Sequence, residues 1–273
     1  MSYFDLLKEN LKEHKDNYVQ ILRLSIADLK KTYHGAALGW FWAIVKPVVS
    51  RFVYWFAIEI GLRKGGDVGD YPFILWLIAG MVPWFYMNEL ITGGTECIRK
   101  YSYLVTKMKY PIMTIPTFTN ISKFLVNAIL VVVVVVIFWI CGYPPSIYLL
   151  QLPFYMVLMF LFFNAWSLFA GMISAIGKDF SNLVKSFVTA VFWLSGVLWD
   201  VEKLAHSNLF FKIFFMINPI TYFSYGFRNC FVYKKWFFED IESLCCILGL
   251  YLILGLLSLW AYKKLRKEIP DVL

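Results

Sequence analysis

The sequence predicts an all-α integral membrane protein with six transmembrane helices, an N-terminal amphipathic interface helix and an outer re-entrant helical segment. Three observations lead to this fold class. Hydrophobic residues make up 60% of the 273-residue chain. Charged residues make up only 16%, whereas a typical soluble domain carries about 25%. The charges also cluster between long apolar runs, which lipid solvates better than one soluble core does. We therefore expect one membrane domain over residues 1–273.

Six apolar runs are the predicted spans. They lie at residues 38–61, 72–92, 112–141, 147–176, 183–199 and 241–262, and the fifth is short. The valine run at 131–136 is typical of a strand in water. In lipid a lone strand leaves its backbone groups unpaired, so a helix is predicted there too. The bundle is expected to occupy 38–262, with a cytoplasmic tail at 263–273.

The first 34 residues are polar but periodic. Phe4, Leu7 and Leu11 recur at helical spacing among lysines, and a similar pattern continues to Leu29. A basic amphipathic helix of this kind is typical of a segment that lies in the membrane interface. We expect residues 1–34 to lie on the cytoplasmic surface without crossing.

A second non-spanning segment is expected at 200–240. It holds two apolar stretches, 209–217 and 220–232, which Asn218-Pro219 separates. Each stretch is too short for a hydrocarbon core of about 30 Å. Two half-spans that enter and return are tolerated where protein or an aqueous cavity surrounds them. The alternative is a surface loop with two amphipathic helices.

The distribution of basic residues predicts the orientation. With both termini in the cytoplasm, inner segments hold 16 Lys and Arg residues and outer segments hold 7. This bias is the one that cytoplasmic loops of membrane proteins show. It also accounts for the net charge of +8. A nucleic-acid partner is not expected, because no compact basic stripe with a known reader motif occurs.

Catalytic and metal sites are not expected. The three histidines are far apart, neither GxSxG nor HExxH occurs, and the five cysteines include no CxxC pair. The stretch from Gly171 to Asp179 resembles a phosphate-binding loop but has five residues between its glycines and Asp after its lysine. If transport is driven by ATP, the ATPase is expected on another chain. No signal peptide is expected, since no short apolar run with a cleavage site begins the chain.

Aromatic and charged residues within the spans are candidates for a transport path. The default interpretation of the aromatic residues is that they lie in the interfacial belts of the membrane. They are Trp42, Tyr54, Trp84, Phe85 and Trp193. The alternative is that some line a path, where ring faces stack on the C–H faces of sugars. Charged residues inside spans also tend to face an aqueous path. For Glu89 and Lys123 the alternative is that they reach the interface from a span end.

The inner loop at 93–110 is a candidate contact for a cytoplasmic partner. Ile98, Tyr101 and Leu104 fall on one side of a short amphipathic helix. The alternative is a solvated basic loop.

The order of several motifs resembles the ABC-2 type polysaccharide permeases, and most of all the teichoic acid translocation permeases. The motifs are Asp28-Leu-Lys-Lys-Thr-Tyr33, Leu38-Gly39-Trp40 with Pro47, Tyr71-Pro-Phe, Ala79-Gly80, Pro83-Trp84-Phe85, the stretch from Leu104 to Pro111, and Asn218-Pro219. The likeness covers nearly the whole chain. O-antigen and capsule exporters share the pattern.

The resemblance implies a homodimeric channel in the bacterial cytoplasmic membrane, bound to two copies of a separate ATPase that holds ATP and Mg²⁺. The cargo it implies is an undecaprenyl-diphosphate-linked polymer, with wall teichoic acid favoured over O-antigen and capsular polysaccharide. The helix ending near Tyr33 is then a gate. The loop at 95–104 is then a coupling helix, with a shorter contact at 178–182.

These expectations define two sets of residues. The substrate and gate set comprises Arg23, Lys30, Lys31, Tyr33, Trp42, Tyr54, Trp84, Phe85 and Trp193. The coupling set comprises Ile98, Arg99, Lys100, Tyr101, Leu104, Lys178 and Asp179. The basic residues of the first set are expected to attract the diphosphate of the lipid carrier.

Two other classes of protein are alternatives to the exporter. A membrane transferase acting on a polyprenyl substrate needs acidic clusters, for which Asp67 and Asp70 or the acidic residues at 239–242 are the candidates. A channel or secondary transporter is favoured by inverted repeats, and none is detected.

Overall fold

The computed structural model describes residues 3–33, 49, 70–201, 204 and 208–273. The part described is all-helical, with no extended strand. The elements are α1 (Tyr3–Asp16), α2 (Tyr18–Tyr33), α4 (Phe73–Lys100), α5 (Ser102–Thr106), α6 (Thr114–Ile140), the 3-10 helix η3 (Ile147–Gln151), α7 (Leu152–Ile176), α8 (Lys178–Leu194), α10 (Leu209–Ile217), α11 (Pro219–Arg228), the π-helical turn η4 (Asn229–Tyr233), α12 (Ile241–Leu265) and α13 (Ile269–Val272).

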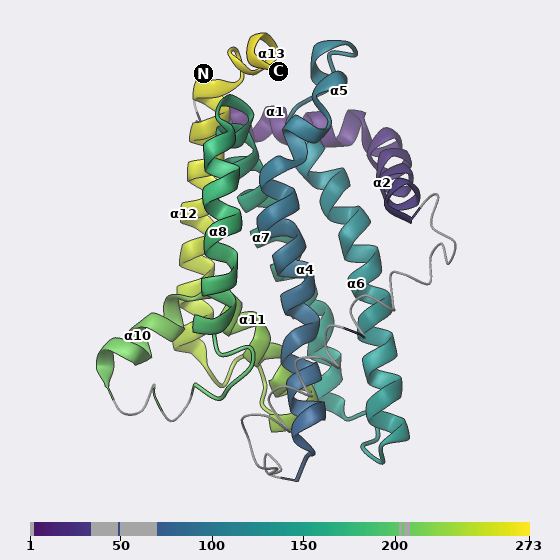
Figure 1. Cartoon of the computed structure of the whole chain (residues 1–273), viewed down its shortest axis with the longest axis vertical. Coiled ribbons are helices and arrows are strands. Elements are labelled where there is room, and N and C mark those ends of the chain that lie inside the picture. The colour runs from purple at the N-terminus through teal and green to yellow at the C-terminus, as the bar shows by residue number, and fades with distance from the viewer. Residues whose placement is uncertain (1–2, 34–48, 50–69, 202–203, 205–207) are drawn as a thin grey trace.

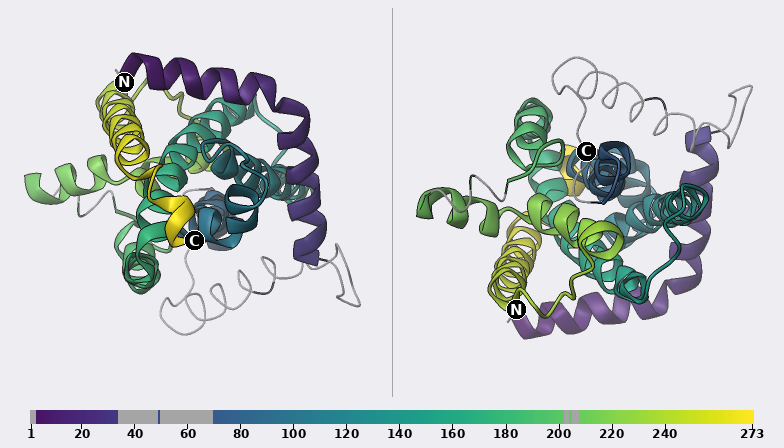
Figure 2. Two further views of the ribbon diagram at one scale, coloured as in Figure 1. Left: turned by 90° about the horizontal axis from the view of Figure 1, so that it is seen from above. Right: turned by 90° about the horizontal axis from the view of Figure 1, so that it is seen from below.

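The long helices stand side by side, and α1 and α2 lie across one end of them (Figure 1). Both chain termini lie at this end, which we call the terminal end. Helices α10 and α11 lie at the other end, which we call the opposite end, and α10 projects sideways from the bundle (Figures 1 and 2). The side of the membrane on which the termini lie stays a prediction.

Four helical stretches in the described part are long and apolar enough to span a membrane. They are Phe73–Thr106, Thr114–Ile140, Ile147–Ile176 and Ile241–Leu265. The first predicted span, 38–61, lies outside the described residues. The fifth, predicted at 183–199, is α8, which begins and ends five residues earlier and has 17 residues, or about 26 Å. Four of the six predicted spans are therefore supported among the described residues.

The N-terminal segment forms two helices where one was predicted, because the chain turns at Asn17 between α1 and α2. Seen along the bundle, the two helices follow adjacent sides of it (Figure 2). Leu6, Ile21 and Leu29 are buried, whereas Phe4 and Leu11 are 63% and 72% exposed. An exposed apolar face on a basic helix suits contact with lipid at the membrane surface.

The segment at 200–240 contains the two predicted short helices. Asn218 ends α10 and caps α11, since its side chain accepts hydrogen bonds from the backbone of Ile220 and Thr221 at 3.0 and 3.5 Å. Pro219 then occupies the first position of α11, where a missing N–H costs nothing. The entry of this segment into the membrane stays a prediction.

Helix α4 is central, because it packs against α6, α7, α8 and α11. Buried polar groups join it to its neighbours: Tyr86 donates to Asn120 of α6, whose amide donates to the carbonyl of Phe160 in α7 at 3.0 Å. Polar side chains between membrane helices stabilise such contacts by about 1 kcal/mol.

Gly94 allows the close approach of α4 and α7. A Cβ atom built there would overlap Ser167, whereas one at the adjacent Gly93 meets nothing within 4 Å. We expect Gly94→Ala to lower the free energy of unfolding by about 1–3 kcal/mol through overpacking. Gly93→Ala is the matched control and should raise it by about 0.5–1 kcal/mol, because alanine favours a helix. Thermal unfolding in detergent measures both; equal effects of the two variants would contradict the packing role.

Candidate functional site

Three side chains meet at the terminal end and join α2 to α4. Asp28 is carried on the buried face of α2, together with Ile21 and Ser25, and is only 3% exposed. Its carboxylate accepts a hydrogen bond from Lys100 Nζ at 2.8 Å and another from the Tyr101 hydroxyl. We call Asp28, Lys100 and Tyr101 the Asp28 cluster.

The electrostatics of this cluster favour an ionised Asp28. Burial alone would raise the pKa of the carboxyl group, but the hydrogen bonds from Lys100 and Tyr101 outweigh burial and hold the pKa below its ordinary value. A buried carboxylate that is paired in this way fixes the position of its helix. The terminal end of α4 is therefore attached to α2.

Arg99 attaches the same end of α4 to α7. Its guanidinium donates to the carbonyl of Ser174 at 2.8 and 3.2 Å and to that of Ala175 at 2.9 Å. These carbonyls belong to the last turn of α7, where helical carbonyls lack an intrahelical partner. The end of α4 is thus attached to both α2 and α7.

Helices α4 and α8 carry polar side chains along their shared side, a surface that we call the polar stripe. It comprises Glu89, Thr92 and Glu96 of α4 and Asn182, Lys185, Ser186 and Thr189 of α8. Lys185 Nζ lies 2.6 Å from Glu96 Oε1, and the Ser181 hydroxyl donates to the same oxygen at 3.3 Å. The four α8 residues lie at positions i, i+3, i+4 and i+7, so they share one face of the helix, and all four are exposed. Polar groups on membrane helices are costly toward lipid and instead face water or protein.

A cavity of about 300 Å³ adjoins the polar stripe and the Asp28 cluster. Its lining includes Asp28, Glu89, Glu96, Lys100 and Lys123. Glu89 pairs with Lys123 of α6 at 3.4 Å. The two residues thus pair across α4 and α6 beside a cavity, and whether they face a transport path or reach the interface from a span end stays a prediction.

The structure separates the predicted substrate and gate residues. Arg23, Lys30 and Lys31 are exposed on α2, whereas Trp84 is buried and stacks on Phe192 with ring centroids 4.8 Å apart. Phe85 is half-buried, and Trp193 is exposed beside the polar stripe on α8. Trp42, Tyr54 and the side chain of Tyr33 lie outside the described residues.

The predicted coupling residues fall into a buried and an exposed group. Ile98, Tyr101 and Leu104 are buried against the core of this chain, so their side chains hold the loop in place. Lys178 and Asp179 are exposed at the start of α8. After α4, the exposed loop residues outside the predicted coupling set are Tyr103, Thr106, Lys107, Met108 and Lys109.

A buried arginine at the opposite end was missed by the sequence analysis. Arg228 of α11 is fully buried and donates to the carbonyls of Gly196 and Val197 at 2.8 and 2.6 Å. Its guanidinium carbon lies 3.4 Å from the ring centroid of Trp76 in α4. The signal was available as a single Arg within the apolar stretch at 220–232. We call Arg228, Trp76 and these two carbonyls the Arg228 cluster.

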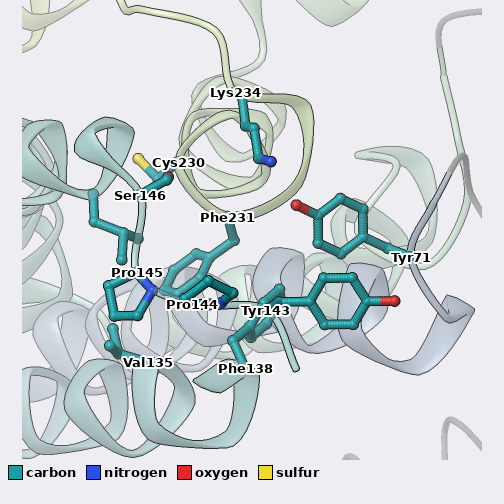
Figure 3. A pocket seen from close by; sticks show the side chains of 11 residues that line it. Tyr71, Val135, Phe138, Tyr143, Pro144, Pro145, Ser146, Cys230, Phe231 and Lys234 are labelled. Carbon is teal, nitrogen blue, oxygen red and sulfur yellow. The ribbon is translucent and has the colours of Figure 1, made fainter. Parts of the chain in front are cut away.

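Two pockets open at the opposite end. Figure 3 shows the smaller, of about 220 Å³, where Tyr71 stacks on Tyr143 and Lys234 points toward the aromatic wall. Its lining is mostly apolar. The larger pocket, of about 510 Å³, lies between α10, α11 and the start of α12.

The acidic residues of the transferase alternative have structural partners. Asp240 caps α12 through the backbone of Ser243 at 3.1 Å, and Glu242 pairs with Lys212 at 3.1 Å. Among the described residues no group of three or more His, Cys, Asp or Glu side chains could hold a metal ion. Asp67 lies outside the described residues.

Burial of Glu13 in α1 predicts that the stability of the chain depends on pH. Burial raises its pKa to about 7, Glu9 adds to the rise, and Arg266 opposes it. Glu13 thus binds a proton more tightly in the folded chain than in the unfolded chain. The contribution of Glu13 to the free energy of unfolding therefore falls as pH rises from about 4.5 to about 7. We expect Glu13→Gln to abolish the loss of stability between about pH 5 and pH 8, as thermal unfolding would measure. The exposed Glu268→Gln is the control; a slope that survives Glu13→Gln would contradict the assignment.

Comparison with known proteins places this helical bundle in a transporter class. The sequence pattern described as ABC-2 type transporter matches residues 19–232. The chain belongs to the ABC-2 type transporter family, whose members are membrane subunits of transporters. The resemblance seen in the sequence is thus confirmed at the level of the family.

Two relatives extend the likeness over nearly the whole chain. The O-antigen export system permease protein RfbA of Myxococcus xanthus is 22% identical over 258 residues, which cover 92% of this chain and 94% of the relative. A protein of the same name from Klebsiella pneumoniae is 21% identical over 247 residues, which cover 90% and 92%. Neither relative is named for teichoic acid.

Proposed function

We propose that the chain is the permease subunit of an ABC exporter that moves an undecaprenyl-diphosphate-linked polysaccharide of the O-antigen type outward across the bacterial cytoplasmic membrane. The observation that carries the proposal is the likeness to two O-antigen export permeases over at least 90% of each chain. The preference for teichoic acid drawn from the sequence has no such support, so the O-antigen alternative replaces it.

The polar stripe supports a path between two copies of the chain. A single copy leaves Asn182, Ser186 and Thr189 exposed along one side of a membrane helix. A second copy facing this side encloses a polar path, which hydroxyl-rich cargo requires and lipid does not provide. The homodimer is therefore part of the proposal.

The terminal end suits the cytoplasmic side. Lys30 and Lys31 are exposed in the last turn of α2, where they can attract the diphosphate of a lipid carrier at the inner surface. Two copies of an ATPase, which bind ATP and Mg²⁺, are proposed to contact the exposed surface formed by residues 103–109 and the start of α8. In this proposal the contacts of Arg99 and Asp28 transmit movement of the ATPase to α7 and α2.

Deletion of this chain tests the proposal. We expect the surface polysaccharide to disappear and the lipid-linked polymer to accumulate inside the cell, where mass spectrometry of extracted lipids would identify it. Re-expression of the intact chain should restore export. A chain carrying Lys185→Glu, which opposes Glu96 with a like charge, should restore it poorly, whereas Lys263→Glu at the exposed end of α12 should restore it fully. Unchanged surface polysaccharide in the deletion strain would exclude the proposed function.

A further inference from the structure

The larger pocket at the opposite end is lined by aromatic rings and carboxylates. It has a volume of about 510 Å³ and lies between α10, α11 and the loop before α12. Ligand pockets usually measure about 300–1,000 Å³ and combine an apolar wall with a few fixed polar groups. This pocket has both components, whereas the one in Figure 3 is smaller and mostly apolar.

The aromatic wall is held in place by a glutamine. Gln151 donates through Nε2 to the carbonyl of Lys235 at 2.7 Å and accepts from the backbone of Phe237 at 2.8 Å. These bonds fix the residues on either side of Trp236, and Gln151 is itself 3% exposed. Trp236 is half-buried and lines the pocket together with Phe237 and Tyr222. The Trp236 ring stacks on Phe238 with centroids 5.8 Å apart, so its other face is the one that can pack against the C–H face of a sugar ring.

The polar groups of the pocket supply both acceptors and a donor. Glu239 Oε1 accepts from the backbone of Trp236 at 2.8 Å, and Asp240 Oδ1 accepts from that of Ser243. Each carboxylate keeps a second oxygen for a ligand hydroxyl. The hydroxyl of Tyr222 is buried and has no hydrogen-bond partner among the described residues. Such an unpaired group is costly, and a ligand that bonds to it recovers the cost.

The surroundings place the pocket at a membrane surface. Lys212, Phe215 and Met216 of α10 line it, while Phe210 and Ile217 on the other face of this helix are 67% and 46% exposed. Helix α10 projects from the bundle at this level (Figure 1). A short helix with an apolar outer face and a lysine toward a polar pocket suits the boundary between lipid and water.

We propose that this pocket binds a saccharide unit, with its ring against Trp236 and its hydroxyls on Glu239, Asp240 and Tyr222. The proposal rests on the proposed function for the source of the saccharide, which is the exported polymer as it leaves the opposite end of the bundle. The chemistry of recognition is independent of that function, because aromatic faces with several acceptors suit any hydroxyl-rich ring.

Saturation-transfer NMR on the full chain in lipid nanodiscs tests the site with free maltose, lactose and N,N′-diacetylchitobiose as probes. We expect transfer to at least one probe at millimolar concentration. Tyr222→Phe should weaken binding about threefold to tenfold by removing one hydrogen bond. Trp236→Ala should weaken it at least about tenfold by removing the stacking face.

Trp260→Ala is the matched control, because Trp260 is 43% exposed near the far end of α12 and does not line the pocket. It should bind the probes as the unaltered chain does. Melting temperatures of all variants should agree, which shows that the pocket variants remain folded. Absence of transfer to every probe, or transfer that survives both pocket variants, would overturn the proposal. The deletion experiment tests the proposed export function alone, and the NMR experiment tests the saccharide site alone. Either claim can therefore fail while the other stands.

Discussion

Replacing Arg228 with methionine is expected to lower the free energy of unfolding by about 2–5 kcal/mol. The change leaves the carbonyls of Gly196 and Val197 buried without their donor, at about 1–3 kcal/mol each. It also removes a guanidinium packed 3.4 Å from the centroid of the Trp76 ring. Thermal unfolding in detergent should show a fall of about 10 °C in the melting temperature.

Two comparisons separate this effect from a loss of charge. Arg23→Met removes an exposed guanidinium from α2 and should leave the melting temperature unchanged. Arg228→Lys keeps the charge but not the planar, forked donor, so it should be intermediate. If Arg228→Met melted at the same temperature as the unaltered chain, the anchoring role of the Arg228 cluster would be wrong.

A substitution at Gly80 tests the Arg228 cluster independently. A Cβ atom at Gly80 would lie 2.5 Å from Nη2 of Arg228. Gly80→Ala should therefore destabilise the unaltered chain and have a much smaller effect in the Arg228→Met background. A double-mutant cycle gives the coupling, which we expect to be about 1–3 kcal/mol. Additive effects would mean that the two residues do not interact.

Replacing Asp28 with asparagine is expected to release α2 from α4. The variant loses charged hydrogen bonds from Lys100 and Tyr101, each worth about 1.5–3 kcal/mol. Hydrogen exchange in α2 should become about tenfold faster or more. Under the proposed function, export should fall about tenfold while the partner continues to hydrolyse ATP, because the α2 gate no longer follows α4.

The matched control is Asp16→Asn, which changes an exposed carboxylate at the end of α1. It should alter neither exchange in α2 nor export. Lys100→Met should speed hydrogen exchange in α2 less than Asp28→Asn does, because Lys100 is half-exposed and Tyr101 still donates to Asp28. Unaltered exchange in the Asp28→Asn variant would show that the cluster does not hold α2.

Much of the fold could be predicted because lipid imposes simple requirements on a sequence. The apolar runs at 112–141, 147–176 and 241–262 became α6, α7 and α12, and the break at Asn218-Pro219 ended one helix and began the next. Helix ends were less predictable. The run predicted at 183–199 ends as a helix at Leu194, because Arg228 and Thr221 from a distant segment bind the backbone at 195–197.

The candidate site was less predictable because it depends on contacts between distant residues. Tyr101 and Leu104 were chosen as one face of a partner-binding helix, and the same periodicity instead describes the face that packs on the chain's own core. Helical spacing identifies a shared face but does not say what covers it. Asp28 was part of a family motif, yet its pairing with Lys100, 72 positions away, has no local signal.

Pro83 lies inside α4 and divides that helix into a short arm and a long arm. Proline removes a backbone hydrogen bond within a helix, and sharp bends occur at such positions. The short arm contacts Arg228 through the ring of Trp76, while the long arm ends at Lys100, about 25 Å away from the proline. A bend of about 10° at Pro83 would carry Lys100 through roughly 4 Å. A small change of angle at Pro83 would therefore correspond to a larger displacement at Lys100, the end of α4 that contacts α2.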